Sequence, residues 1–216
     1  MKTMTKIISL LCLIAALLAF SGCGVTIHEG VGEGDALDKS SGTTWYHAST
    51  CYEAVELEKK LGKLVVTDKQ SYEIYKLPNM DPDLWIGTED KNVLYAEGVT
   101  LPTLADMKPT LLNFHADSSA DKKLYSIDET DLLAAIVADY SENESVPYPS
   151  IAPHHTYRVR FVSDLYPGIY YALTYIEYNT DYVVNDQNYG KYFLYDRFDQ
   201  KFIPVGDEIH TALGIE

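Results

Sequence analysis

The sequence predicts an α+β fold in which β-hairpins and a tyrosine-rich antiparallel β-sheet meander pack with two or three helices. Three observations support this class. Short runs of β-branched and aromatic residues alternate with turn-forming Gly, Pro, Asn and Asp along most of the chain. Residues 166–195 contain nine of the 18 tyrosines, a residue type that suits strands. Residues 128–140 carry apolar side chains at helical spacing.

The first segment of the chain is typical of a secretory signal. Two lysines and no acidic residue precede the run 7–20, IISLLCLIAALLAF. This run is shorter than the roughly 20 apolar residues of a membrane-spanning helix. A positive start followed by a short apolar stretch and small residues therefore indicates export from the cytoplasm.

The small residues Ser21 and Gly22 precede Cys23 directly. This arrangement resembles the lipobox of bacterial lipoproteins, although Phe20 stands where leucine is usual. The resemblance implies removal of residues 1–22, a lipid on Cys23 and a bacterial cell membrane as the partner, outside the cytoplasm. The membrane could be the outer one in a cell that has one. An ordinary cleaved signal and an uncleaved anchor are the alternatives.

Charge and cysteine content restrict the mature domain further. Removal of residues 1–22, which carry two lysines and no acid, leaves 194 residues with a formal charge of −17. Such acidity argues against binding nucleic acid or an anionic lipid surface. With Cys12 in the signal and Cys23 lipidated, Cys51 has no partner for a disulfide. We interpret Cys51 as a buried apolar side chain, with a reactive nucleophile as the alternative.

Residues 23–44 are interpreted as the lipidated N-terminus and a flexible tether. Residues 24–44 contain five glycines and no hydrophobic period, and a coil of this length would hold the domain about 25 Å from the bilayer. The GVGEG stretch within it lacks the third glycine of a nucleotide-binding loop. A single α+β domain is then predicted over 45–216, with a possible subdomain boundary in the 141–153 loop, which contains three prolines.

Within this domain, local patterns predict the elements in order. Thr50 and Glu53 have capping-box spacing, which predicts a helix ending at Gly62. A helical turn is predicted at 103–107, a longer helix at 128–140 and a short helix at 207–213. The remaining patterns indicate strands. They are 64–67, 71–77, 84–87, 93–98, 110–114, 123–128, 155–164, 169–178, 191–199 and 200–206.

The tyrosines of 169–178 are the best candidates for a ligand-binding surface. On a strand, Tyr171 and Tyr175 point to one face, while Tyr170 and Tyr178 point to the other. Exposed tyrosines stack on sugars or peptides, so the ligand would be a protein, glycan or peptide. The alternative is that these rings simply stabilise the sheet.

The sequence contains no motif that is typical of a metal site or of a catalytic site. His154 and His155 are adjacent, so on a strand they point to opposite faces. The acidic stretch 181–188 could hold calcium, but turn formation explains it equally well. No GxSxG or HExxH motif is present, and we predict no metal, cofactor or catalytic residue.

The sequence thus favours a membrane-anchored surface lipoprotein that binds an envelope component or an extracellular ligand. The alternative is an envelope hydrolase. The two acidic residues that such an enzyme uses can be far apart in the sequence and are brought together only by folding, so a sequence motif is not required for them. A third possibility is an accessory subunit of an envelope protein complex.

Overall fold

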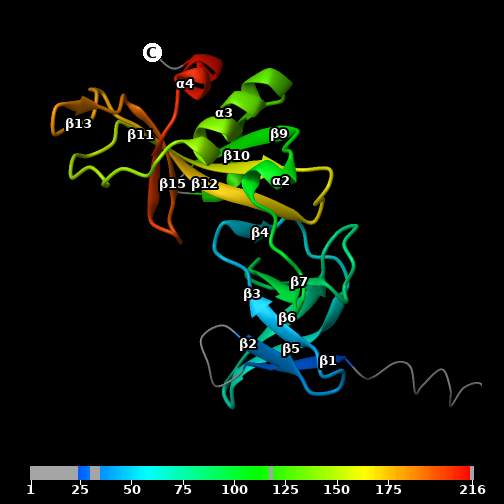
Figure 1. Ribbon diagram of the computed structural model, residues 1–216. Helices are drawn as coiled ribbons and strands as arrows, with labels where there is room; N and C mark the ends of the chain where they lie inside the picture. Colours follow the sequence, from blue (N-terminus) through cyan, green and yellow to red (C-terminus); the bar gives the residue numbers. More distant parts are fainter. Residues whose placement is uncertain (1–23, 30–34, 117–118, 215–216) are drawn as a thin grey trace, which may run out of the picture.

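The computed structural model describes residues 24–29, 35–116 and 119–214. They form a closed β-barrel and a second β-sheet that is covered by helices. In Figure 1 the barrel lies below the sheet, and α3 lies on the other side of the sheet. Among these residues, no helix is long and apolar enough to cross a bilayer. The predicted signal segment and Cys23 lie outside the described residues.

Seven strands close the barrel in the order β1-β2-β3-β8-β7-β6-β5. They are β1 (Val25–Glu29), β2 (Asp35–Asp38), β3 (Thr44–His47), β5 (Lys60–Thr67), β6 (Gln70–Lys76), β7 (Trp85–Thr88) and β8 (Val93–Ala96). Neighbouring pairs are antiparallel except β1 and β5, whose parallel pairing closes the barrel. Its interior is filled by side chains such as Ile27, Leu64 and Ile74, each at most 1 % exposed.

The second sheet has the order β10-β9-β11-β12-β15-β16, and β4 also pairs with β12. Its strands are β4 (Tyr52–Ala54), β9 (Leu111–Ala116), β10 (Ser119–Ile127), β11 (His155–Val162), β12 (Ile169–Glu177), β15 (Tyr192–Asp196) and β16 (Lys201–Pro204). A small hairpin of β13 (Val183–Val184) and β14 (Gln187–Asn188) lies between β12 and β15. The predicted C-terminal meander is therefore confirmed.

Three helices pack on this sheet: α2 (Leu104–Met107), α3 (Thr130–Glu142) and α4 (Glu208–Leu213). Leu133 and Ile136 of α3 and Ile209 of α4 are buried in one core cluster with Phe114 and Tyr175 of the sheet. Trp85 and Val93 of the barrel belong to the same cluster. The helices predicted at 103–107, 128–140 and 207–213 are confirmed, and a shared core joins barrel and sheet.

The predicted α+β class was wrong. The protein is mostly β, with 45 % strand, 13 % helix and one closed seven-stranded barrel. The barrel depends on the parallel pairing of Val25 with Gly62, between residues far apart in the sequence. A Cβ at position 62 would lie 1.7 Å from the carbonyl oxygen of Val25, so this close approach requires glycine. The local pattern instead predicts the end of a helix at Gly62.

The predictions of a flexible tether and of a helix after Thr50 were also wrong. The tether predicted over 23–44 contains β1 and β2, and Ile27 and Ala36 within it are fully buried. The helix predicted after Thr50 is replaced by β4, whose Ala54 lies in register with Ile169. The short apolar runs of both segments are buried by pairing with distant strands, which overrides the local helical spacing.

Segment 141–153 follows the prediction only in part. Residues 141 and 142 belong to α3, and no strand or helix is assigned from 143 to 153. Val146 in this segment packs with Phe202 of β16, so the segment runs along the sheet. The last barrel strand ends at Ala96, and the elements from Leu104 onward belong to the sheet and its helices, as β4 does earlier in the chain.

Candidate functional site

β4 lies at the junction between the barrel and the sheet and borders two pockets, which share Tyr52 as a lining residue. Its Tyr52 and Glu53 point to opposite sides of the strand, as neighbouring residues of a strand do. Glu53 also forms a β-bridge with Asn92, next to barrel strand β8. We call the pocket on the Glu53 side the ion-pair pocket and the larger one, which contains Tyr140 and Tyr171, the tyrosine pocket.

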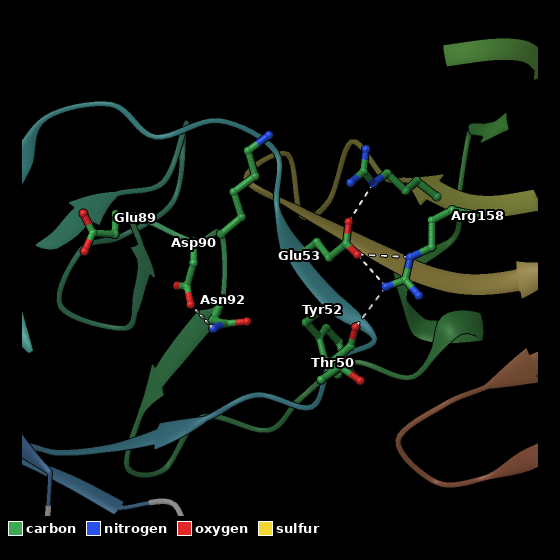
Figure 2. A pocket seen from close by; sticks show the side chains of 9 residues that line it. Thr50, Tyr52, Glu53, Glu89, Asp90, Asn92 and Arg158 are labelled. Carbon is green, nitrogen blue, oxygen red and sulfur yellow. Dashed lines mark hydrogen bonds and ion pairs between the residues drawn. The ribbon is translucent and has the colours of Figure 1, made fainter. Parts of the chain in front are cut away.

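The ion-pair pocket has a volume of about 450 Å³. It is lined by Thr50, Tyr52, Glu53, Glu89, Asp90, Lys91, Asn92, Arg158 and Arg160. Figure 2 shows the carboxylate of Glu53 facing Arg158, while the side chain of Glu89 is directed away from both. The pocket thus contains both signs of charge.

Two arginines of β11 hold the Glu53 carboxylate. Arg158 and Arg160 are two positions apart on the strand, so their side chains share a face. Arg158 donates from Nε at 3.1 Å to Oε1, and Arg160 donates from Nε at 2.6 Å to Oε2. Burial alone would raise the pKa of Glu53, but the two guanidinium groups outweigh it and lower that pKa below its usual value. Glu53 therefore stays charged and joins β4 to β11.

Further contacts hold this arrangement in place. The guanidinium of Arg160 lies over the ring of Tyr170, 5.4 Å from its centroid. Arg158 also donates from Nη2 to the carbonyl oxygen of Thr50 at 3.3 Å. On the other wall, Asp90 accepts a hydrogen bond from Asn92 at 2.9 Å and another from Thr88. The side-chain contacts of Glu53 thus fix β4 to β11 within the sheet, and the bridge of Glu53 to Asn92 connects β4 to the barrel.

The tyrosine pocket is larger, with a volume of about 570 Å³. It is lined by Ser49, Tyr52, Leu101, Thr103, Leu104, Ala105, Tyr140, Ser141, Asn143, Ser145, Tyr171, Asp196, Phe198, Asp199, Lys201 and Ile203. Its residues come from β4, α2, α3, β12, β15, β16 and the segments next to them. The pocket combines aromatic rings with one buried carboxylate, an amide and several hydroxyl groups.

Asp196 is the central polar group of the tyrosine pocket and is only 3 % exposed. Its Oδ1 accepts the backbone N–H groups of Phe198 at 2.9 Å and Asp199 at 3.0 Å. Its Oδ2 accepts the Tyr140 hydroxyl at 3.2 Å, and the Tyr140 and Tyr171 hydroxyl oxygens are 3.4 Å apart. The carboxylate thus has a defined orientation and shapes the tight β15–β16 turn.

Burial of these groups raises several pKa values. Burial is the largest cause of the raised pKa values of Tyr140 and Tyr171. The interaction with Tyr171 raises the pKa of Tyr140 further. Burial, together with the nearby Asp196 carboxylate, raises the pKa of Cys51 to about 12. Cys51 is a free thiol that is 2 % exposed, so the prediction of a buried apolar side chain is confirmed. A thiol with such a high pKa is a poor nucleophile at neutral pH.

The four tyrosines that the sequence singled out do not form one surface. Tyr171 is 8 % exposed and lines the tyrosine pocket, whereas Tyr170 lies beside Arg160 on the opposite face of β12. Tyr175 is fully buried in the core that joins barrel and sheet. Tyr178 is 1 % exposed and packs with Phe193 and Phe202 in a separate cluster. Tyr175 and Tyr178 are therefore core residues.

The other candidate ligand groups are placed as follows. The rings of His154 and His155 are 4.0 Å apart at the start of β11. In the acidic stretch, Asp181 accepts a hydrogen bond from Asn188 at 2.7 Å, and Asn185 and Asp186 adopt positive φ in the β13–β14 turn. In the described part of the chain, no group of three His, Cys, Asp or Glu side chains could hold a metal ion.

Of the residues that line the two pockets, the sequence pattern singled out Tyr171, which lines the tyrosine pocket, and did not indicate the charged residues of the ion-pair pocket. The spacing of Arg158 and Arg160 on a predicted strand indicated a shared face, but their acidic partner lies more than 100 residues earlier in the chain. Tyr140 is the last residue of the helical pattern at 128–140, and the packing of that helix on the sheet brings its hydroxyl to Asp196.

No protein-family model, curated protein or solved structure matches the chain. The chemistry of the pockets is therefore the structural basis for assigning a function.

Proposed function

We propose that the chain is a lipid-anchored binding protein outside the cytoplasm and that its tyrosine pocket holds a sugar unit of a glycan. The observation that carries this proposal is the placement of an exposed aromatic ring beside buried polar groups. Phe198 is 60 % exposed on the β15–β16 turn, and Asp196 and Tyr140 lie in the same pocket. Sites for small ligands commonly combine aromatic walls with a few oriented polar groups.

The two kinds of groups match the two sides of a sugar ring. An aromatic ring contacts the C–H face of a sugar, and a carboxylate or amide at the edge binds its hydroxyl groups. Asp196 accepts three hydrogen bonds within the protein, and an ionised carboxylate has about four acceptor positions. The Cys51 thiol also hydrogen-bonds to this carboxylate, so the other polar groups of the lining, such as the Asn143 amide, bind the hydroxyl groups of the ligand. The ion pair of Lys201 with Asp199, at 2.7 Å, adds further polar groups at the rim.

The location forms the second part of the proposal. The basic start, the short apolar run and the Ser21-Gly22-Cys23 sequence support export and lipid attachment at Cys23. A glycan ligand of the cell envelope or of the surroundings would be accessible to a protein anchored there.

The proposal predicts that removal of the Phe198 ring weakens glycan binding. In calorimetric titrations with chitotetraose and cellotetraose as probes, Phe198→Ala should reduce the affinity for the bound sugar about tenfold, or ~1.4 kcal/mol. Tyr125→Ala is the matched control, because Tyr125 is 47 % exposed on β10 and lies outside the pocket. It should leave the affinity unchanged.

Several results would contradict this assignment. Binding of neither sugar at millimolar concentration, or equal effects of the two substitutions, would exclude a glycan at Phe198. Binding of a short peptide instead would favour a peptide ligand, and release of new reducing ends would favour the envelope hydrolase. Recovery of one membrane protein in stoichiometric amount from cells, without sugar binding, would favour the accessory subunit.

A further inference from the structure

A third pocket lies at one end of the barrel. It has a volume of about 550 Å³, within the range of about 300–1,000 Å³ for small-molecule sites, which also occur in the mouths of β-barrels. Its lining residues are Val25, Ile27, Asp38, Ser40, Ser41, Thr43, Trp45, Leu61, Ile74, Pro82, Asp83 and Ile86. The lining residues lie on strands β1, β2, β3, β5, β6 and β7 and on the β2–β3 and β6–β7 connections. We call this pocket the barrel mouth; it shares no lining residue with the junction pockets.

The floor of the barrel mouth is apolar. Ile27, Ile74 and Ile86 belong to the interior of the barrel and are at most 2 % exposed as whole residues. Trp45 forms part of the wall and is 5 % exposed. Its indole N–H is buried and has no hydrogen-bond partner among the residues that the structure describes. This floor favours an apolar group, whose transfer from water is favourable.

The rim of the barrel mouth is acidic. Asp38 is 5 % exposed and accepts hydrogen bonds from the N–H of Ser40 at 2.9 Å and from the hydroxyls of Ser40 and Ser41 at 2.7 Å each. Burial acts to raise the pKa of Asp38, but these serine hydrogen bonds lower it overall, so the carboxylate is charged at neutral pH. Asp83 is an exposed second acid of the lining.

Among the residues that the structure describes, no ion pair balances these two charges. The lining contains no Lys, Arg or His, and within the described ranges neither Asp38 nor Asp83 forms an ion pair. The ion-pair pocket is different, because there the Glu53 carboxylate is held by two arginines. A buried carboxylate of this kind favours a cationic partner, since burying an unpaired charge is costly.

We propose that the barrel mouth binds an amphiphile with one alkyl chain and an ammonium head group. The alkyl chain lies on the apolar floor formed by Ile27, Ile74 and Ile86. The ammonium group lies at the rim that carries Asp38 and Asp83, where it replaces water around two like charges. Because this pocket is separate from the tyrosine pocket, the proposal does not depend on glycan binding there.

Three probes separate the contributions of chain and charge. Decylammonium carries both features, decanol keeps the chain without the charge, and ethylammonium keeps the charge with a short chain. The indole N–H of Trp45 serves as the reporter in NMR titrations of the full chain, and Trp85→Phe assigns it because the protein has two tryptophans. Decylammonium below its micelle concentration should shift the Trp45 signal. Decanol should bind about tenfold more weakly, or ~1.4 kcal/mol, and ethylammonium should cause no shift at the same concentration.

Substitutions at the rim test the role of the carboxylates. Asp83→Asn should weaken decylammonium binding about fivefold or more and leave decanol binding unchanged; Asp83 is exposed, so its loss should not perturb folding. Asp38→Asn should weaken binding further, with the Ser40 and Ser41 contacts to its side-chain oxygens partly retained. Asp68→Asn is the matched control, because Asp68 is exposed on the β5–β6 turn outside the pocket.

The proposal is overturned by any of three results. The first is an unshifted Trp45 signal in the presence of decylammonium while the protein stays folded. The second is equal affinity for decanol and decylammonium. The third is an equal response of the Asp83→Asn and Asp68→Asn variants. A normal glycan titration of the same samples would show that failure here is independent of the tyrosine pocket.

Discussion

Glu53 shows how one side chain joins two strands that are far apart in the sequence. It lies on a strand of three residues, and its carboxylate contacts two arginines of β11 that are more than 100 residues away in sequence. Its side chain is 20 % exposed, and that of Arg160 is 9 % exposed. Because the charges are largely removed from water, loss of one partner leaves the others unpaired, which costs more than loss of a surface ion pair.

The substitution Glu53→Gln should therefore destabilise the protein clearly. We expect a loss of about 2–3 kcal/mol in the free energy of unfolding, below the ~3–5 kcal/mol of a fully buried pair because a fifth of the side chain is exposed. Urea unfolding measures this difference. The matched control is Glu58→Gln, whose ion pair with Lys76 at 3.2 Å is exposed and should contribute less than ~1 kcal/mol.

The lowered pKa of Glu53 determines how the difference in free energy of unfolding between wild type and Glu53→Gln depends on pH. A carboxyl group whose pKa is lower in the folded state contributes its full stability above its unfolded-state pKa, about 4.3 for glutamate. That contribution is lost as the pH falls through the folded-state pKa. The gap in stability between wild type and Glu53→Gln should thus be constant above about pH 5 and narrow in more acidic solution. A gap that widens on acidification would contradict the charged state of Glu53.

At the scale of elements, β1 determines whether the barrel closes. It pairs antiparallel with β2 and parallel with β5, so it lies between strands on both sides. Its central residue Ile27 is fully buried, and Leu64, its partner in register on β5, is 1 % exposed. A flexible tether in this position would leave the edges of β2 and β5 unpaired, with their backbone groups exposed.

Because Ile27 is fully buried inside the barrel, we expect Ile27→Ala to be strongly destabilising. A buried isoleucine replaced by alanine loses about 2–5 kcal/mol, because a cavity remains in the core. Leu37→Ala on the neighbouring strand is the control, since Leu37 is 40 % exposed and should change stability by less than ~1 kcal/mol. Thermal unfolding of both variants measures the contrast. Wild-type stability of Ile27→Ala would mean that β1 is not part of the folded barrel.

At the scale of the whole molecule, the position of β1 changes the expected distance from a membrane. Val25, the first residue of β1, follows the proposed lipid-bearing Cys23 by two positions. Two residues of extended chain span at most about 7 Å, compared with the ~25 Å expected of a flexible tether. A lipid on Cys23 would thus hold the barrel against the bilayer, and the sheet would lie beyond it (Figure 1).

Spin labels on lipid-anchored protein in vesicles test this arrangement. A label at Lys39→Cys, on the β2–β3 turn of the barrel, should show strong relaxation by a paramagnetic lipid head group. A label at Thr180→Cys, near the β13–β14 hairpin, should show little. The unlipidated Cys23→Ala chain, carrying the same labels, should show neither effect. Equal relaxation at both sites would indicate a long and mobile connection.

The sequence by itself determined the elements whose signals are local. The apolar stripe of 128–140 predicted α3, and the alternating runs with turn residues predicted most strands to within a few residues. The lone Cys51 was recognised as a buried side chain from cysteine counting and from the general behaviour of free thiols. Such features depend on residues close together in the chain, so they can be read before the chain is folded.

Only the tertiary structure decided how these elements combine. The parallel pairing of Val25 with Gly62 closes the barrel, and the pairing of Ala54 with Ile169 makes a strand where capping residues predicted a helix. The pockets follow from the same kind of contact, because Tyr140 meets Asp196 only when α3 packs on the sheet. Strand pairing and packing join residues far apart in sequence, and their free energy exceeds the small local preferences, on the order of 1 kcal/mol or less per residue, that a sequence pattern reports.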